Sequence, residues 1–259
     1  MKIGRLLIVP DREQIEKSIR LAKQYDCSFE YNDFYLPAVL DNEMQTDEII
    51  SAYLKLKELP ENCTLHGAFF DVTPFSDDPR IVEVSDLRIE QSLCTARKIG
   101  AKAVVFHTNF VPNFMVDYYC ENWVERSELY WKEKLEKYSD INIYIENMFD
   151  MSYVLLEKLA RRLSVYANFG VCFDYAHAHA FGDETKIEEW VKALAPYIRH
   201  VHINDNDFAA DLHLALGEGR IDWKDFKYYY ETYFPQASVL VEMKDLAAAE
   251  KSLEYIRGL

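Results

Sequence analysis

Histidine and carboxylate residues recur at or near the ends of short apolar segments of this sequence. The residues at these positions are His66, His107, Glu146, Asp174, His202 and Glu242. Imidazole and carboxylate together are typical ligands of zinc, manganese, iron or cobalt, whereas magnesium prefers oxygen ligands and water. A bound ion of this kind polarises a carbonyl or acidifies a hydroxyl or a water molecule. The pattern therefore predicts metal-assisted chemistry, with zinc or manganese as the expected ion.

More residues of the same type stand close to this set. His177 follows Asp174 by three positions, and Asp211 and His213 lie two apart in a polar loop. Nine candidates are too many for one ion, so the sequence is compatible with one to three ions and with Glu146 as a bridge. His200, two residues before His202, is either a supporting or a purely structural residue.

Each candidate also has a simpler interpretation. Taken alone, His66 fits a core histidine bonded to the backbone, and Asp211 and His213 fit a solvated loop; membership of the set favours a ligand role. Glu146 and Glu242 are the strongest candidates, because burial disfavours an ionised carboxylate that has no cation beside it.

Aromatic residues follow several of the same segments. We expect Phe69 and Tyr175 to wall a substrate pocket together with His177, although simple packing explains the two aromatic side chains nearly as well.

Short β-branched and aromatic runs alternate with longer charged segments of helical period. The expected strands are residues 3–9, 28–31, 64–68, 103–107, 141–146, 170–174, 200–203 and 239–242. The expected helices are residues 12–25, 46–59, 82–99, 116–138, 152–163, 185–195, 222–233 and 245–256. Eight such units predict an α/β fold, a (β/α)₈ barrel forming one domain over residues 1–259, with the active site at the carboxyl ends of the strands. An open doubly wound sheet is the alternative, but its glycine-rich phosphate turn is missing from the sequence.

The amino-acid composition argues against some classes of binding partner. The net charge of −15 disfavours a nucleic acid, whose binding normally requires lysine and arginine against phosphates. The apolar runs are strand-sized and far shorter than the roughly 20 residues of a membrane span. The five cysteines form no C-x-x-C pair and their number is odd, which suits reduced thiols in the cytoplasm. Composition leaves the oligomeric state open.

Several motifs resemble those of the xylose-isomerase-like barrel superfamily, which includes sugar isomerases, ketose epimerases, inosose-processing enzymes and endonuclease IV. The matching segments are Leu65-His66-Gly67, Val105-Phe106-His107, Ile145-Glu146-Asn147, Phe173-Asp174-x-x-His177, His200-Val201-His202-x-Asn204-Asp205 and His213-x-x-Leu216-Gly217-Glu218-Gly219-Arg220-Ile221-Asp222-Trp223. The combination of His-x-His with Leu-Gly-Glu-Gly is specific for the superfamily and weak for any one member.

The resemblance implies roles for the candidate residues. The four-residue metal site of the family maps onto Glu146, Asp174, His202 and Glu242. The additional zinc ligands of endonuclease IV map onto His66, His107, His177, Asp211 and His213. Ketose epimerases place an arginine shortly after the histidine of the seventh strand, where this sequence reads Asn206-Asp207-Phe208.

The expected function is a metal-dependent isomerase or epimerase of a small sugar, sugar phosphate or polyol. Glu146 and Glu242 would be the catalytic pair: one removes a proton next to the carbonyl and the other returns it through a metal-stabilised enediolate. A hydride shift would use the same residues differently. The alternative is a zinc phosphodiesterase like endonuclease IV, and a metal-storing or ligand-sensing barrel is a third, non-enzymatic interpretation.

Overall fold

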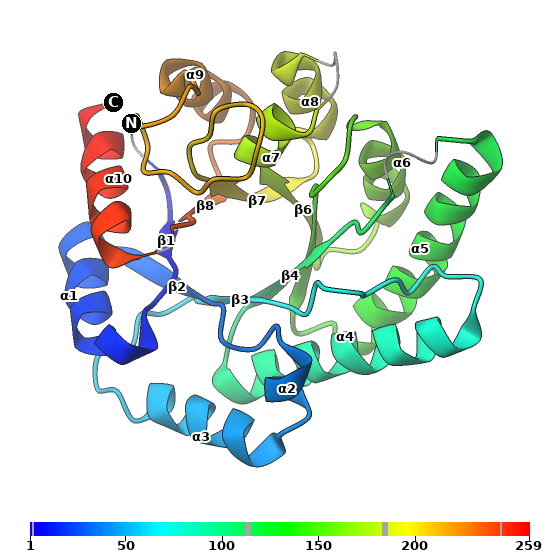
Figure 1. Cartoon of the computed structure of the whole chain (residues 1–259), viewed down its shortest axis with the longest axis horizontal. Coiled ribbons are helices and arrows are strands. Elements are labelled where there is room, and N and C mark those ends of the chain that lie inside the picture. Colours follow the sequence, from blue (N-terminus) through cyan, green and yellow to red (C-terminus); the bar gives the residue numbers. More distant parts are fainter. Residues whose placement is uncertain (2, 112–114, 183–185, 244) are drawn as a thin grey trace.

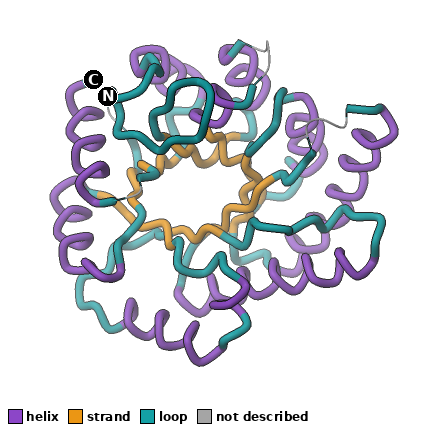
Figure 2. Tube along the Cα trace, viewed as in Figure 1, coloured by secondary structure: helices purple, strands orange, loops and turns teal. Residues whose placement is uncertain are grey.

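Eight parallel strands close into a barrel in the computed structural model, which describes residues 1, 3–111, 115–182, 186–243 and 245–259. The strands follow one another around the barrel in chain order, and β1 pairs with β8 to complete the ring (Figure 1). Helices surround the ring of strands on its outside (Figure 2). The predicted (β/α)₈ fold is confirmed, and the open doubly wound sheet is excluded.

The strands are β1 (Leu6–Ile8), β2 (Cys27–Tyr31), β3 (Thr64–His66), β4 (Ala103–His107), β5 (Asn142–Glu146), β6 (Phe169–Asp174), β7 (Ile198–Ile203) and β8 (Ser238–Val241). The helices are η1 (Arg12–Gln14), α1 (Ile15–Tyr25), α2 (Pro37–Leu40), α3 (Glu43–Leu54), α4 (Pro79–Ile99), α5 (Asp117–Lys137), α6 (Val154–Leu163), α7 (Tyr175–Ala180), α8 (Ile187–Leu194), α9 (Trp223–Tyr233) and α10 (Leu246–Gly258).

Burial on both faces explains why the strands read as near-continuous apolar runs. All residues of β4 and β6 are buried, because one face packs inside the barrel and the other packs against helices. The helices bury one stripe each; in α6 the buried residues include Leu156, Leu159 and Leu163 at helical spacing. Side chains on the inner face near the carboxyl ends of the strands are therefore held by a packed scaffold.

Several boundaries differ from the prediction, each for a local reason. The expected helix 46–59 runs instead from Glu43 to Leu54, because the Asn42 side chain caps it by accepting a hydrogen bond from the Gln45 amide at 3.1 Å. The expected helix 12–25 begins with the 3₁₀ turn η1, and the strand expected over 64–68 ends at His66. The start of the helix expected over 185–195 lies outside the described residues.

Two short helices were not predicted. Helix α2 begins at Pro37, a residue favoured in a first helical turn, and helix α7 follows β6 directly. The Asp174 side chain caps α7 by accepting from the His177 amide at 2.6 Å. Within the part of the chain that the structure describes, no helix is long and apolar enough to cross a membrane.

Candidate metal centre

The candidate residues lie at the carboxyl ends of neighbouring strands. His107 and Glu146 are register partners at the ends of β4 and β5, and Asp174 and His202 are partners on β6 and β7. Glu242 follows β8 directly, and its amide continues the ladder by donating to the Ile203 carbonyl at 3.0 Å. The register of the sheet therefore places these side chains at one level of the barrel mouth.

Glu146 is the centre of the cluster. Its Oε2 atom lies 3.6 Å from His66 Nε2 and 3.5 Å from His107 Nε2. Its Oε1 atom lies 3.4 Å from both His177 Nδ1 and His202 Nδ1. One buried carboxylate thus faces imidazole nitrogens on two sides, which is the arrangement a bridging metal ligand requires.

A second group shares the same pocket. His202 Nδ1 lies 3.5 Å from Glu242 Oε2, and His177 Nδ1 lies 3.5 Å from Asp174 Oδ2. Candidate ligand atoms lie within 4.8 Å of one another in each of three overlapping sets around this pocket. These sets are His66–His107–Glu146, Glu146–Asp174–His177 and Asp174–His202–Glu242.

Asp211 and His213 form the outer part of the cluster. Asp211 Oδ2 lies 3.5 Å from His177 Nε2 and 2.9 Å from His213 Nε2. The loop that carries them is closed by paired backbone hydrogen bonds of 2.9 Å between Asp205 and Leu214. The predicted ligands of the loop therefore reach the strand-end residues.

The buried carboxyl group of Asp205 holds the far side of this loop. It accepts hydrogen bonds from the Gly217 and Ile221 amides at 2.9 and 3.1 Å and from Trp223 Nε1 at 3.0 Å. Gly219 is required beside it, because a Cβ there would stand 2.3 Å from Asp205 Oδ1. Gly219 of the Leu-Gly-Glu-Gly motif is thus explained by close packing against Asp205, whereas Gly217 is required by its φ of +85° and by the Tyr255 ring beside it.

Electrostatics within the pocket call for a cation. Burial raises the pKa of Asp174 to about 7, and the negative charges of Glu146 and Glu242 add to that rise. Burial lowers the pKa of His177, but Asp174 and Asp211 outweigh it and raise this pKa to about 10. Burial acts on Glu146 in the same direction, but His202 and His107 outweigh it and hold the pKa of Glu146 well below its usual range. The carboxylates therefore depend on positive charge in the pocket, which protonated histidines supply here and which a divalent ion would supply when bound.

The hydrogen bonding of the pocket fits a metal as well. Several buried donor and acceptor atoms have no hydrogen-bond partner among the described residues: Glu146 Oε2, Asp174 Oδ2, His177 Nε2, His202 Nδ1 and Asp211 Oδ1. Unpaired buried polar atoms are costly and rare in folded proteins. Their convergence, with a donor set of imidazoles and carboxylates, fits one or more divalent ions.

The three residues predicted to contact a substrate, Phe69, Tyr175 and His177, lie in different surroundings. The Phe69 ring lies 5.2 Å from the His66 ring and 4.9 Å from the His107 ring, so it borders the cluster. The buried Tyr175 ring packs 5.0 Å from Phe226 of α9, within the layer between barrel and helices. His177 lies among the candidate metal ligands.

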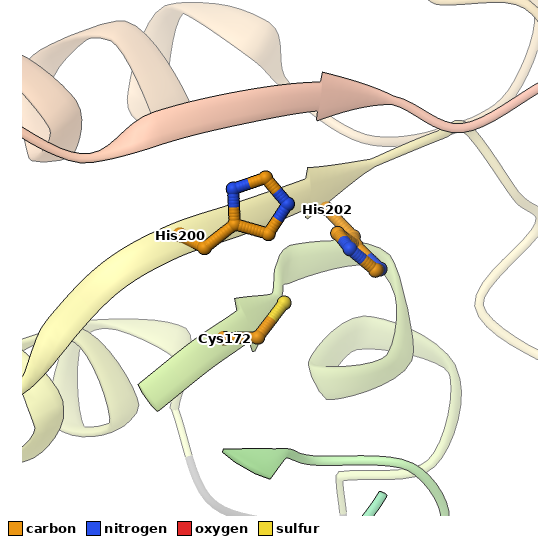
Figure 3. Close-up of side chains that lie close together, drawn as sticks. All are labelled: Cys172, His200 and His202. Carbon is orange, nitrogen blue, oxygen red and sulfur yellow. The ribbon is translucent and has the colours of Figure 1, made fainter. Parts of the chain in front are cut away.

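Sequence reasoning missed Cys172 and Glu30, which belong to a polar group inside the barrel. Cys172 of β6 and His200 and His202 of β7 approach one another beneath the strand ends (Figure 3). Glu30 of β2 lies 3.1 Å from an imidazole nitrogen of each of these two histidines. The available signal was an acidic residue within the short, fully buried strand Cys27–Tyr31.

Three solved structures are similar over nearly the whole chain. They are the TTHB071 protein from Thermus thermophilus soaked with ZnCl₂ (22% identical; TM-score 0.74; 100% of this chain and 97% of that one), a D-tagatose 3-epimerase-like protein (21%; 0.76; 98% and 96%) and endonuclease IV from Thermus thermophilus (17%; 0.64; 100% and 98%). At these identities the similarity shows the fold. The family model described as "Xylose isomerase-like TIM barrel" matches residues 29–259. This chain therefore belongs to the xylose isomerase-like TIM barrel family.

Proposed function

We propose that this protein is a divalent-metal-dependent isomerase or epimerase of a small carbohydrate. The observation that carries the proposal is the convergence of Glu146 and Glu242 on one point: their carboxylates lie 3.4 and 3.5 Å from the same atom, His202 Nδ1. Two carboxylates close to one position are suited to removing a proton from a carbon next to a carbonyl and returning it.

The residues have distinct roles in this proposal. Glu146, Asp174, His202 and Glu242 would hold one ion, and Glu146 would bridge it to a second ion held by His66 and His107. When bound, a divalent ion stabilises negative charge that develops on the oxygens of the substrate. The Glu242 side chain is 14% exposed and can reach a substrate, whereas Glu146 is 1% exposed and lies beneath it.

The surroundings of the pocket support a small uncharged ligand. No lysine or arginine occurs in the loop residues described after β2, β3, β4 and β5, residues 32–36, 67–78, 108–111, 115–116 and 147–153. Large aromatic side chains, Phe70 and Phe149, are exposed instead in two of these loops. In the loop after β7 the Arg220 guanidinium lies 5.0 Å from the centre of the exposed Phe208 ring. A DNA backbone is normally bound through cationic side chains, whereas aromatic faces suit the apolar faces of sugars. The D-tagatose 3-epimerase-like structure is consistent with this substrate class.

One observation favours a second candidate, a zinc phosphodiesterase like endonuclease IV. A single-ion epimerase has no use for His66, His107, Asp211 and His213, yet all four border the central group. The number of bound ions bears on the choice. The pocket contains four carboxylates, those of Glu146, Asp174, Asp211 and Glu242. One divalent ion leaves the net charge of this group negative, whereas three ions make it positive. Only the positively charged pocket favours a phosphate substrate.

The test combines a metal count with two substrate classes. We expect the zinc- or manganese-loaded protein to interconvert a ketose or aldose in a panel and to leave abasic duplex DNA intact. In D₂O, proton transfer incorporates deuterium at the carbon next to the carbonyl, whereas a hydride shift does not. Metal-dependent nicking of abasic DNA that is lost in His107→Ala, with no turnover of sugars, would replace this proposal with the second candidate.

A further inference from the structure

Glu30 is a fully buried carboxylate inside the barrel, away from any solvent. It lies on β2, while its nearest polar neighbours belong to β3 and β7, so its side chain spans the barrel interior. Burying an ionised carboxylate costs several kcal/mol unless hydrogen bonds and opposite charge compensate it. The free-energy cost of burying Glu30 beneath the candidate metal ligands suggests that its carboxylate has a specific role.

Both oxygens of Glu30 lie close to a polar group, and the hydrogen bonds are made by Oε2. Oε2 accepts a hydrogen bond from Thr64 Oγ1 at 2.6 Å and lies 3.1 Å from His200 Nε2. Oε1 lies 3.1 Å from His202 Nε2. On the other side of its ring, His200 Nδ1 lies 2.7 Å from the hydroxyl of Ser238.

These contacts favour one placement of the protons: the His200 contact has hydrogen-bond geometry, and Glu30 Oε1 and His202 Nε2 lie 3.1 Å apart with no other hydrogen-bond partner among the described residues. A carboxylate oxygen has only lone pairs, so a nitrogen 3.1 Å away must carry a hydrogen to avoid repulsion. Nε2 is therefore the protonated nitrogen of His200 and of His202. The Nδ1 lone pair of His200 then accepts from Ser238, and Nδ1 of His202 is the nitrogen left to bind an ion in the pocket.

The free nitrogen of His202 faces the metal pocket. Neither ring nitrogen of His202 makes a hydrogen bond among the described residues, but Nε2 lies next to Glu30, whereas Nδ1 lies within 3.5 Å of both Glu146 Oε1 and Glu242 Oε2. An imidazole binds a metal through a lone pair, and a carboxylate on its other nitrogen fixes the tautomer and the ring orientation.

We infer that Glu30 is a positioning residue for the metal centre: it holds His202 in the Nε2–H tautomer and directs the Nδ1 lone pair at the ion. His200 shares the charge of Glu30 as a second donor and does not bind the ion itself. The inference rests on the proposed function, because it assumes an ion at Glu146, Asp174, His202 and Glu242.

An alternative metal site that includes His200 and His202 can be distinguished from this inference by experiment. Cys172, His200 and His202 also place ligand atoms within 4.8 Å of one another. An ion held there would take the Cys172 thiolate and a ring nitrogen of His202 as ligands. Cys172→Ser would then lose metal, whereas Glu30 as a positioning residue predicts unchanged metal content in Cys172→Ser.

The experiment uses zinc as the probe and reads binding and tautomer directly. Long-range ¹H–¹⁵N NMR of the zinc-loaded wild type should show a hydrogen on His202 Nε2 and zinc on Nδ1. Zinc affinity is then measured by competition with a chelator for the wild type, Glu30→Gln and Glu90→Gln. Glu90 is a matched control, because its carboxylate is paired with Lys134 between α4 and α5, outside the barrel.

We expect Glu30→Gln to bind zinc about 10- to 100-fold more weakly, the range found for residues that orient metal-bound histidines. Glu90→Gln should bind zinc like the wild type. A His202 that binds zinc through Nε2, or a Glu30→Gln protein with wild-type affinity, overturns the inference while leaving the metal centre intact. A wild type that binds no zinc overturns the proposed function and this inference together. The NMR result on the wild type decides the matter even if Glu30→Gln does not fold.

Discussion

Replacing Glu146 by glutamine should remove more metal than any other single substitution in the pocket. The amide keeps the shape of the side chain but loses the charge and one acceptor oxygen. Two of the three candidate ligand sets contain Glu146, and its two oxygens face different histidines: His66 and His107 on one side, His177 and His202 on the other. We therefore expect Glu146→Gln to lose two ions, and His66→Ala to lose only the one shared with His107.

The size of the effect follows from binding linkage. A ligand at about 100 times its dissociation constant stabilises the folded state by roughly 2.7 kcal/mol. A chain of this size gains about 2–4 °C in Tm per kcal/mol, so each ion should add about 5–10 °C. Glu146→Gln should therefore lose about 10–20 °C of the zinc-dependent increase in Tm, and His66→Ala should lose about 5–10 °C of it.

Elemental analysis after dialysis gives the number of ions, and thermal unfolding with zinc or with a chelator gives the rise in Tm. Glu188→Gln is the control, because it makes the same chemical change in an exposed pair with Lys192 on α8. The reasoning is refuted if Glu146→Gln keeps its full metal content and its full zinc-dependent rise in Tm. Equal losses in Glu146→Gln and His66→Ala would contradict the bridging role alone.

Three further predictions concern catalysis, pH and packing. Glu242→Gln should reduce kcat on the sugar substrate about 10²–10⁴-fold and keep most of the metal, because Glu242 is a partly exposed ligand of one ion and the bridging Glu146 remains; steady-state kinetics with a metal count checks this, and turnover within about tenfold of wild type would contradict it. Burial raises the pKa of Asp150 to about 6, above its unfolded value, so its contribution to stability is complete below about pH 4 and is lost as pH rises through about 6. Asp150→Asn should therefore gain roughly 3 kcal/mol over the wild type between about pH 4 and pH 7 in urea unfolding of the metal-free protein, and equal pH profiles would disprove this. Gly219→Ala should destabilise the protein by about 1–3 kcal/mol, because its Cβ would meet Asp205 and the Asn206 carbonyl, whereas Gly258→Ala has open space and should be neutral in the same assay.

The order of elements was readable from the sequence because it depends on local pattern. Strand-sized apolar runs alternate with segments of helical period, and parallel strands need crossover helices, so eight units predict a closed barrel. The strand-end positions of His107, Glu146 and Asp174 follow from the same pattern, since a run that ends in a polar residue marks its own end. Helix ends were less predictable, because caps such as Asn42 and Pro37 act through one or two residues.

Which side chains meet was decided only by closing the barrel. Glu30 and His202 are far apart in the sequence and lie on β2 and β7, strands that are not neighbours in the sheet. Their contact exists because inward-facing side chains of a closed barrel meet across its interior, and no local pattern records that distance. The same holds for Tyr175: position after a strand suggested a pocket wall, but the short helix α7 turns its ring toward Phe226 and α9. The sequence by itself determined the fold and the composition of the metal pocket, whereas the tertiary structure determined which atoms face one another, because that depends on the register and curvature of the whole sheet.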